Sequence, residues 1–133
     1  MFSIIDDLWI FSKDGLPIVE FCKEGKIDKS LLGAFFSAIK SFSKKISSGD
    51  ELSSFILKDC KFTLVSALKN DAILVCKSDP KHKEKKIHKL CNVIVRIFEE
   101  TFDSSDINNW DGDLSFFDDF KDKLDLYFKM SAL

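Results

Sequence analysis

The stretch IIDDLWIFSKDGLPIVEFCK, residues 4–23, decides the fold that we expect for this chain. Two apolar runs, 8–11 and 18–22, flank the turn residues 13–17. An Asp-Gly pair between such runs predicts a β-hairpin with a type I′ turn, which needs positive φ at both central residues. Pro17 cannot donate to a strand ladder, so it should stand at a strand start. Strands that are apolar on both faces are expected near the middle of a sheet, with helices over it.

The chain after this hairpin predicts three further strands and three helices. Apolar residues recur at helical spacing over 29–46, and strand-like segments follow at 52–57, 61–68 and 72–76. Asp79 and Pro80 are typical of a helix start, and the apolar stripe of that helix continues to about residue 102. The last helix should begin near Leu114, with Asp113 or Ser115 as its cap.

These elements give the order β-β-α-β-β-β-α-α. We therefore expect an α+β fold with a five-stranded antiparallel sheet and helices packed on both faces. A chain of 133 residues is expected to form a single domain over 1–133. Within it we expect a core at 1–102, a polar linker at 103–113 and a C-terminal helix at 114–133.

The composition excludes several classes of protein. The chain is 45% hydrophobic with 14 Phe, which is too apolar for a disordered protein. A net charge of −2 argues against nucleic-acid binding, which needs a basic face. No segment resembles a signal peptide or an integral membrane span, so we expect a cytoplasmic protein. The four cysteines lie in apolar runs without a C-x-x-C pair, and we expect buried thiols rather than disulfides.

Charge is distributed unevenly along the sequence. A basic run contains Lys81, Lys83, Lys85, Lys86 and Lys89, broken only by Glu84, and residues 99–125 carry ten acids against two lysines. Each run fits a solvated helix face. The sharper hypothesis is that the lysine run meets an acidic partner or an anionic lipid surface.

The residues of catalysis and metal binding do not form a recognisable set. His82 and His88 are six residues apart, so they lie on different helix faces and cannot share a metal. Two S-x-x-K matches, Ser37–Lys40 and Ser41–Lys44, lack the other parts of that active site. No nucleophile, base and orienting group can be assembled, and no Gly-rich loop cradles a phosphate. We therefore expect a non-enzyme without a cofactor or metal.

At the level of local sequences the chain resembles the longin domain, a relative of the roadblock fold. The resemblance rests on LWIFSKDGLPIVEF (8–21), SLLGAFFSAIKSFSKKI (30–46), FILKDCKFTLVSALKNDAILVCK (55–77) and IVRIFEETF (94–102). A chain that starts on a strand and ends with an added helix favours longin over roadblock. The resemblance implies a non-catalytic adaptor of vesicle trafficking or a dimeric regulator of small GTPases.

The resemblance also implies a homodimer or a heterodimer with another longin or roadblock protein. Dimers of this family pair the first helix with its mate and join the third strands at the sheet edge. Carried over to this chain, the interface involves Ser37, Lys40, Ser41, Lys44, Leu52, Ser54 and Phe55. The physical argument agrees, because an edge strand that contains Phe55-Ile56-Leu57 is a template for pairing unless it is covered. The first helix also has a wide apolar stripe that contains Phe35, Phe36 and Phe42, and we expect part of it to face a second protein.

Two other functions are compatible with five antiparallel strands and helices. A small-molecule sensor of the PAS or GAF type needs a hollow core with convergent polar groups, whereas this core is rich in Phe. A profilin-like actin binder begins and ends with helices that pack together, and the N-terminal residues here predict no helix.

Overall fold

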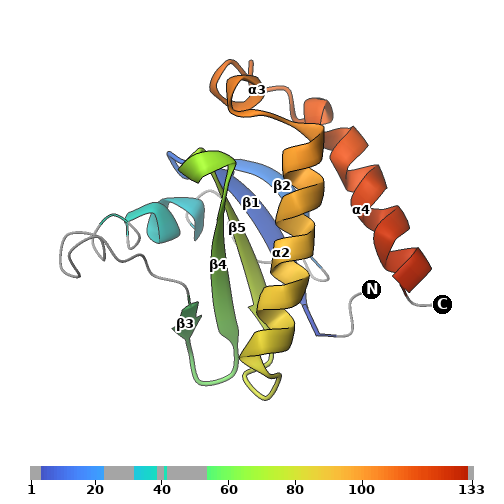
Figure 1. Ribbon diagram of the computed structural model, residues 1–133. Helices are drawn as coiled ribbons and strands as arrows, with labels where there is room; N and C mark the ends of the chain where they lie inside the picture. The colour runs from blue at the N-terminus through green and yellow to red at the C-terminus, as the bar shows by residue number, and fades with distance from the viewer. Residues whose placement is uncertain (1–3, 23–31, 39–40, 42–53, 132–133) are drawn as a thin grey trace.

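A computed structural model describes residues 4–22, 32–38, 41 and 54–131. It contains a five-stranded antiparallel sheet in the order β2-β1-β5-β4-β3, which confirms the predicted fold class. The strands are β1 (Asp7–Ser12), β2 (Pro17–Phe21), β3 (Ser54–Ile56), β4 (Lys61–Ala67) and β5 (Ala72–Ser78). Helices cover both faces of this sheet (Figure 1).

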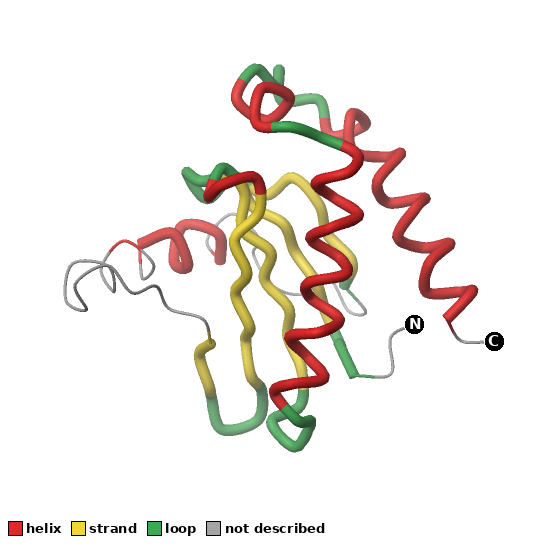
Figure 2. The backbone as a smooth tube through the Cα atoms, in the orientation of Figure 1, coloured by secondary structure: helices red, strands yellow, loops and turns green. Residues whose placement is uncertain are grey.

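One face of the sheet is covered by the C-terminal helices, and the other by the helix that follows the hairpin (Figure 2). The C-terminal elements are α2 (Glu84–Thr101), α3 (Ser104–Asn108), the 3-10 helix η2 (Leu114–Phe117) and α4 (Asp118–Ser131). The first predicted helix, 29–46, is helical at 32–38 and 41, and its remaining residues lie outside the described part of the chain.

The N-terminal hairpin forms, but its turn differs from the prediction, and β1 lies near the middle of the sheet as expected whereas β2 does not. Of the two central turn residues only Gly15 has a positive φ, 87°, so the turn is not type I′. The Gly15 amide donates to the Ser12 carbonyl oxygen at 2.9 Å, which makes a three-residue loop closed by glycine. β5 is the central strand and β2 is an edge strand. Ile18 and Val19 of β2 are nevertheless only 3% exposed, because η2 packs beside this edge.

The long helix begins later than its sequence pattern indicates. Asp79 does not cap it. The Asp79 Oδ1 atom accepts from the Lys81 amide at 2.9 Å, and the Asp79 carbonyl accepts from the His82 amide at 3.2 Å. This local turn competes with a helix, so α2 starts at Glu84. Its inward stripe matches the prediction, since Ile87, Cys91, Ile94, Val95 and Phe98 are buried.

The predicted linker 103–113 contains the short helix α3. Its N-terminus has a capping box, in which the Asp103 side chain accepts from the Asp106 amide and the Asp106 side chain accepts from the Asp103 amide. Asp113 then caps η2 through the Ser115 amide, as the sequence predicts. These caps let the chain turn back, so that α4 packs against α2.

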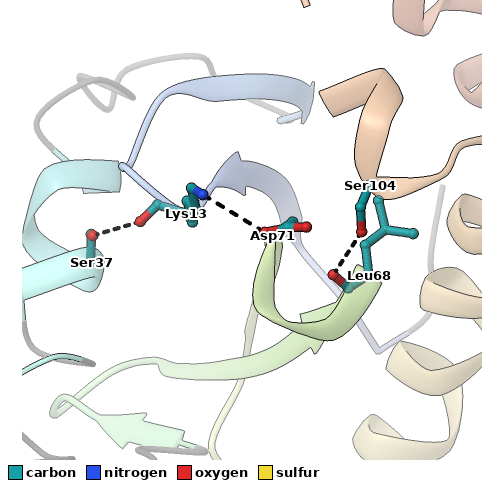
Figure 3. A network of polar contacts seen from close by, with 5 residues as sticks. All are labelled: Lys13, Ser37, Leu68, Asp71 and Ser104. Atoms are coloured by element: carbon teal, nitrogen blue, oxygen red, sulfur yellow. Dashed lines mark hydrogen bonds and ion pairs between the residues drawn. The ribbon is translucent and has the colours of Figure 1, made fainter. Parts of the chain in front are cut away.

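The turn between β4 and β5 is hydrogen-bonded to α2 and α3 on one side and to the N-terminal hairpin on the other (Figure 3). Leu68 and Lys69 both have positive φ, 51° and 53°, an uncommon conformation for residues with a side chain. The Leu68 amide donates to the Glu99 Oε2 atom of α2 at 2.9 Å, and its carbonyl accepts from the Ser104 hydroxyl at 3.3 Å. On the hairpin side, the Lys13 amide donates to the Asp71 carbonyl at 3.1 Å. These bonds hold the strained turn in place.

Candidate functional site

The candidate site is the sheet edge formed by β3, together with the helix at 32–38 beside it. Among the described residues β3 pairs only with β4, because it is the last strand of the sheet. An edge strand of this kind presents backbone donors and acceptors that a further strand can use. Figure 1 shows this edge on the opposite side of the molecule from α4.

A ladder of aromatic rings connects this edge to the core. Its members, in order from the core outward, are Trp9, Phe62, Phe36, Phe35 and Phe55. Successive ring centroids lie 6.4, 5.2, 5.4 and 6.1 Å apart, which is within the range of favourable aromatic contacts. Trp9 and Phe36 are each 1% exposed, whereas Phe35 is 45% exposed. The ladder therefore begins in the core and ends at the surface.

Two further apolar side chains are exposed at the same sheet edge. Ile56 lies opposite Lys61 and so faces the α2 side of the sheet, whereas Phe55 faces the first helix. Ile56 at the end of β3 is 65% exposed, and Leu57 directly after it is 47% exposed. We call Phe35, Phe55, Ile56 and Leu57 the edge patch. The sequence had already indicated Phe35 by the excess width of the helical stripe, and Ile56 and Leu57 by the apolar edge strand. A patch of this kind is typical of a protein–protein contact.

The interface residues implied by the family resemblance are placed unequally. Ser54 and Phe55 lie on β3 and are half-buried, and Ser41 is exposed on the first helix. The Ser37 hydroxyl donates to the Lys13 carbonyl oxygen at 3.1 Å, so it ties its helix to the hairpin turn (Figure 3). Lys40, Lys44 and Leu52 lie outside the described residues.

The predicted lysine patch lies at the start of α2. All five of its members, Lys81, Lys83, Lys85, Lys86 and Lys89, are exposed. Glu84, which interrupts the run, is held by Lys61 at 3.3 Å and lies 3.6 Å from His88. The Lys61 ammonium lowers the pKa of the Glu84 carboxyl, and His88 contributes less. Glu84 thus forms an ion pair with the nearly buried Lys61. The five exposed lysines give this end of the molecule an excess of positive charge.

The titratable groups of the core form no recognisable catalytic set. The Cys91 thiol donates to the Cys76 sulfur at 3.3 Å, and burial raises the pKa of the Cys76 thiol well above its usual value. Such a thiol stays protonated and unreactive. Cys22, Cys60, Cys76 and Cys91, which all lie within the described residues, form no disulfide. Within the described part of the chain, no three His, Cys, Asp or Glu side chains are arranged to hold a metal ion.

None of the described helices has both the length and the apolar character that a membrane crossing requires.

Comparison with known proteins identifies the fold. No protein-family model matches the chain, and no curated protein matches its sequence. Among solved structures, Myxococcus xanthus MglB is 16% identical, with a TM-score of 0.55, over 72% of this chain and 85% of that one. A Roadblock/LC7 domain from Streptomyces avermitilis is 12% identical, with a TM-score of 0.58, over 71% and 82%. A structure described as MglB with tetrameric arrangement is 11% identical, with a TM-score of 0.51, over 64% and 68%. The chain has the roadblock and longin fold.

Proposed function

We propose that this chain is a non-catalytic interaction module that dimerises through the edge patch and, as a dimer, binds and regulates a small GTPase in the cytoplasm. The observation that carries the dimer is the aromatic ladder, which reaches exposed Phe35 and half-buried Phe55 on a strand with no second neighbour among the described residues. A two-fold pairing of β3 with β3 would bury these side chains and satisfy the free backbone groups of both edges. The partner is a second copy or another longin or roadblock chain.

The comparisons support a protein that forms oligomers. One similar structure is described as an MglB in a tetrameric arrangement, so this fold occurs in oligomers. The GTPase part of the proposal comes from the longin resemblance of the sequence. A subunit of a trafficking complex is the neighbouring role within that family.

The dimer is tested by placing a charge in the edge patch. Ile56→Lys and Phe55→Lys each put an ammonium group where the second edge strand would approach, and a charge buried there without a partner opposes association. We expect light scattering to give twice the chain mass for the parent protein and the single-chain mass for both variants. Leu126→Lys is the matched control, because Leu126 is 58% exposed on α4, away from β3. A parent that is monomeric at high concentration would refute the proposed interface.

The GTPase is tested by affinity capture from the lysate of the source cell, with GDP and with a non-hydrolysable GTP analogue. We expect a small GTPase to be enriched in one nucleotide state and to be lost with Ile56→Lys. A consistent set of other proteins in both states would assign the chain to a structural complex instead, and the GTPase proposal would fall.

We extend the proposal to the lysine patch at the start of α2, as a contact for an acidic partner or an anionic lipid. Lys85→Glu with Lys89→Glu should then weaken capture of the partner, or pelleting with phosphatidylserine vesicles, in a salt-dependent manner. The same two changes at Lys123 and Lys129 of α4 serve as the control, since both are exposed lysines elsewhere. Equal losses for the two pairs would show that only net charge matters.

A further inference from the structure

A surface cavity of about 290 Å³ lies where the chain passes from α3 to η2. This end of the molecule carries α3 and is remote from β3, as Figure 1 shows. The cavity is therefore separate from the edge patch, and an inference about it does not depend on the proposed function. Its lining combines two aromatic rings with carboxylate, amide and hydroxyl groups. The lining residues are Trp110, Phe116, Asp106, Asp111, Asn109 and Ser105.

The two aromatic rings are held in place from beneath. The Trp110 Nε1 atom donates to the Asp113 carbonyl oxygen at 2.8 Å, and its ring lies edge-on to Phe117 at 5.3 Å. Phe116 contacts Phe102 and Phe117, each at 5.3 Å between ring centroids, yet it remains 44% exposed. Phe117 itself is fully buried. Trp110 and Phe116 are thus anchored to the core on one side and open to a ligand on the other.

The segment of chain that forms the cavity is strongly acidic. Residues 97–120 contain no Lys or Arg and eight acids, which are Glu99, Glu100, Asp103, Asp106, Asp111, Asp113, Asp118 and Asp119. Hydrogen bonds from the Ser105 hydroxyl and from the Asp106 amide lower the pKa of the Asp103 carboxyl. The Ser115 hydroxyl and amide do the same for the pKa of Asp113. A negative field over an aromatic surface attracts cations.

The chemistry of the lining selects the kind of cation. The described carboxylates do not converge into a metal site, so a chelated metal ion does not fit. A guanidinium group does fit, because its planar face stacks on aromatic rings while its N–H donors reach carboxylate and amide oxygens. We propose that this cavity binds an arginine side chain presented by a basic segment of a partner protein.

The test uses the two tryptophans as internal reporters in a nuclear magnetic resonance titration of the whole chain. The probe is the blocked peptide Gly-Arg-Gly-Arg-Gly, with versions that carry lysine or the neutral isostere citrulline in place of arginine. We expect the Trp110 indole N–H signal to move saturably with the arginine peptide, less with lysine and not with citrulline. The Trp9 signal should stay, since Trp9 is 1% exposed on the sheet face that bears the first helix.

Paired variants distinguish a formed site from general negative charge. Asp106→Asn with Asp111→Asn should weaken peptide binding several-fold more than Asp118→Asn with Asp122→Asn, which removes the same charge outside the cavity. Trp110→Leu should weaken it about three- to fivefold, the size expected for a cation–π contact at an exposed site. If Trp110→Leu does not fold, Phe116→Leu tests the second ring.

Three results would overturn the proposal. The first is a Trp110 signal that does not respond to the arginine peptide. The second is an equal loss of binding for the two aspartate pairs, which would indicate diffuse attraction. The third is a Trp110 signal that moves with protein concentration alone, since the cavity would then be occupied by a second copy of the chain.

Discussion

The two faces of the sheet are closed to different degrees, and this difference separates stability from recognition. On the α2 face, Phe98, Phe117 and Phe120 are all fully buried, and the chain covers that face with its own helices. On the opposite face the aromatic ladder passes from buried Trp9 to exposed Phe35. The first face is a closed core. Among the described residues, Phe35 on the second face and Ile56 and Leu57 at the β3 edge are exposed, and we propose that they contact another molecule.

Changes on the α2 face should therefore affect folding, and changes at the edge patch should affect assembly. Because the two sets of residues lie on opposite faces, their effects on the free energy of unfolding should be nearly additive. The predictions below test this separation, beginning with the largest effect.

The largest effect is expected for Phe98→Ala. The Phe98 ring contacts Phe102, Phe117 and Phe120 with centroids 5.2, 6.5 and 5.1 Å away, so its removal leaves a cavity in the middle of the α2 face. We expect a loss of about 3–5 kcal/mol in the free energy of unfolding, measured by urea denaturation. Phe116→Ala, at a ring that is 44% exposed, is the control and should cost about 1 kcal/mol. Equal losses would mean that the α2 face is not the closed core.

The next effect concerns how the first helix sits on the opposite face. Gly33 lies against the hairpin turn, and a Cβ atom there would collide with the Gly15 carbonyl oxygen and lie 2.6 Å from Phe11 Cδ1. Gly33→Ala should therefore destabilise the chain by about 1–3 kcal/mol, despite the higher helix propensity of alanine. The exposed neighbour Ala34, changed to Ser, controls for propensity. If Gly33→Ala proved stabilising, the contact between helix and hairpin would be looser than described.

The parts of this fold that the sequence predicted are those governed by periodicity. The stripe of α2 and the alternation of β4 follow from apolar spacing, and β5 follows from a continuous apolar run that is typical of a central strand. The start of α2 was wrong because Asp79 forms a turn with Lys81 and His82, and short polar side chains serve turns as readily as helix caps. The type I′ prediction failed for a related reason. Asp14-Gly15 satisfies more than one hairpin geometry, whereas the consecutive positive φ values occur at Leu68 and Lys69, which carry no sequence signal for them.

The edge patch was predictable in part, because some of its apolar residues exceed what one helical stripe or one edge strand can bury. Phe35 exceeded the width of one helical stripe, and the edge strand was too apolar to stay uncovered. The cavity beside α3 was not predictable. Its lining comes from the predicted polar linker at 103–113 and from Phe116 of the predicted C-terminal helix. The capping box and the turn at Asp113 bring Trp110 and Phe116 to one cavity.

A smaller effect is expected at a buried polar group on the α2 face, and it should be a gain in the free energy of unfolding. The Thr63 hydroxyl is fully buried and has no hydrogen-bond partner in the part of the chain that the structure describes. Thr63 pairs with Cys76 across β4 and β5, which places it on the same face as that core residue. Thr63→Val keeps the shape and removes the unpaired hydroxyl, so it should stabilise the chain by about 1 kcal/mol in urea denaturation. Thr101→Val is the control and should give no gain, because the Thr101 hydroxyl donates to the Ile97 carbonyl at 2.8 Å.

The smallest effect is a pH dependence at the end of the α2 face, where α3 begins. The Ser105 hydroxyl and the Asp106 amide lower the pKa of Asp103 in the folded chain. A carboxyl whose pKa is lower when folded contributes stability above its unfolded pKa, ordinarily about 3.9, and that contribution disappears as the pH falls through the folded pKa. Asp103→Asn keeps an oxygen acceptor for the cap but cannot titrate. The drop in urea midpoint between pH 6 and pH 3 should therefore be smaller for Asp103→Asn than for the parent. Asp122→Asn makes the same change of net charge on exposed α4, so an equal reduction there would assign the effect to overall charge and not to the cap.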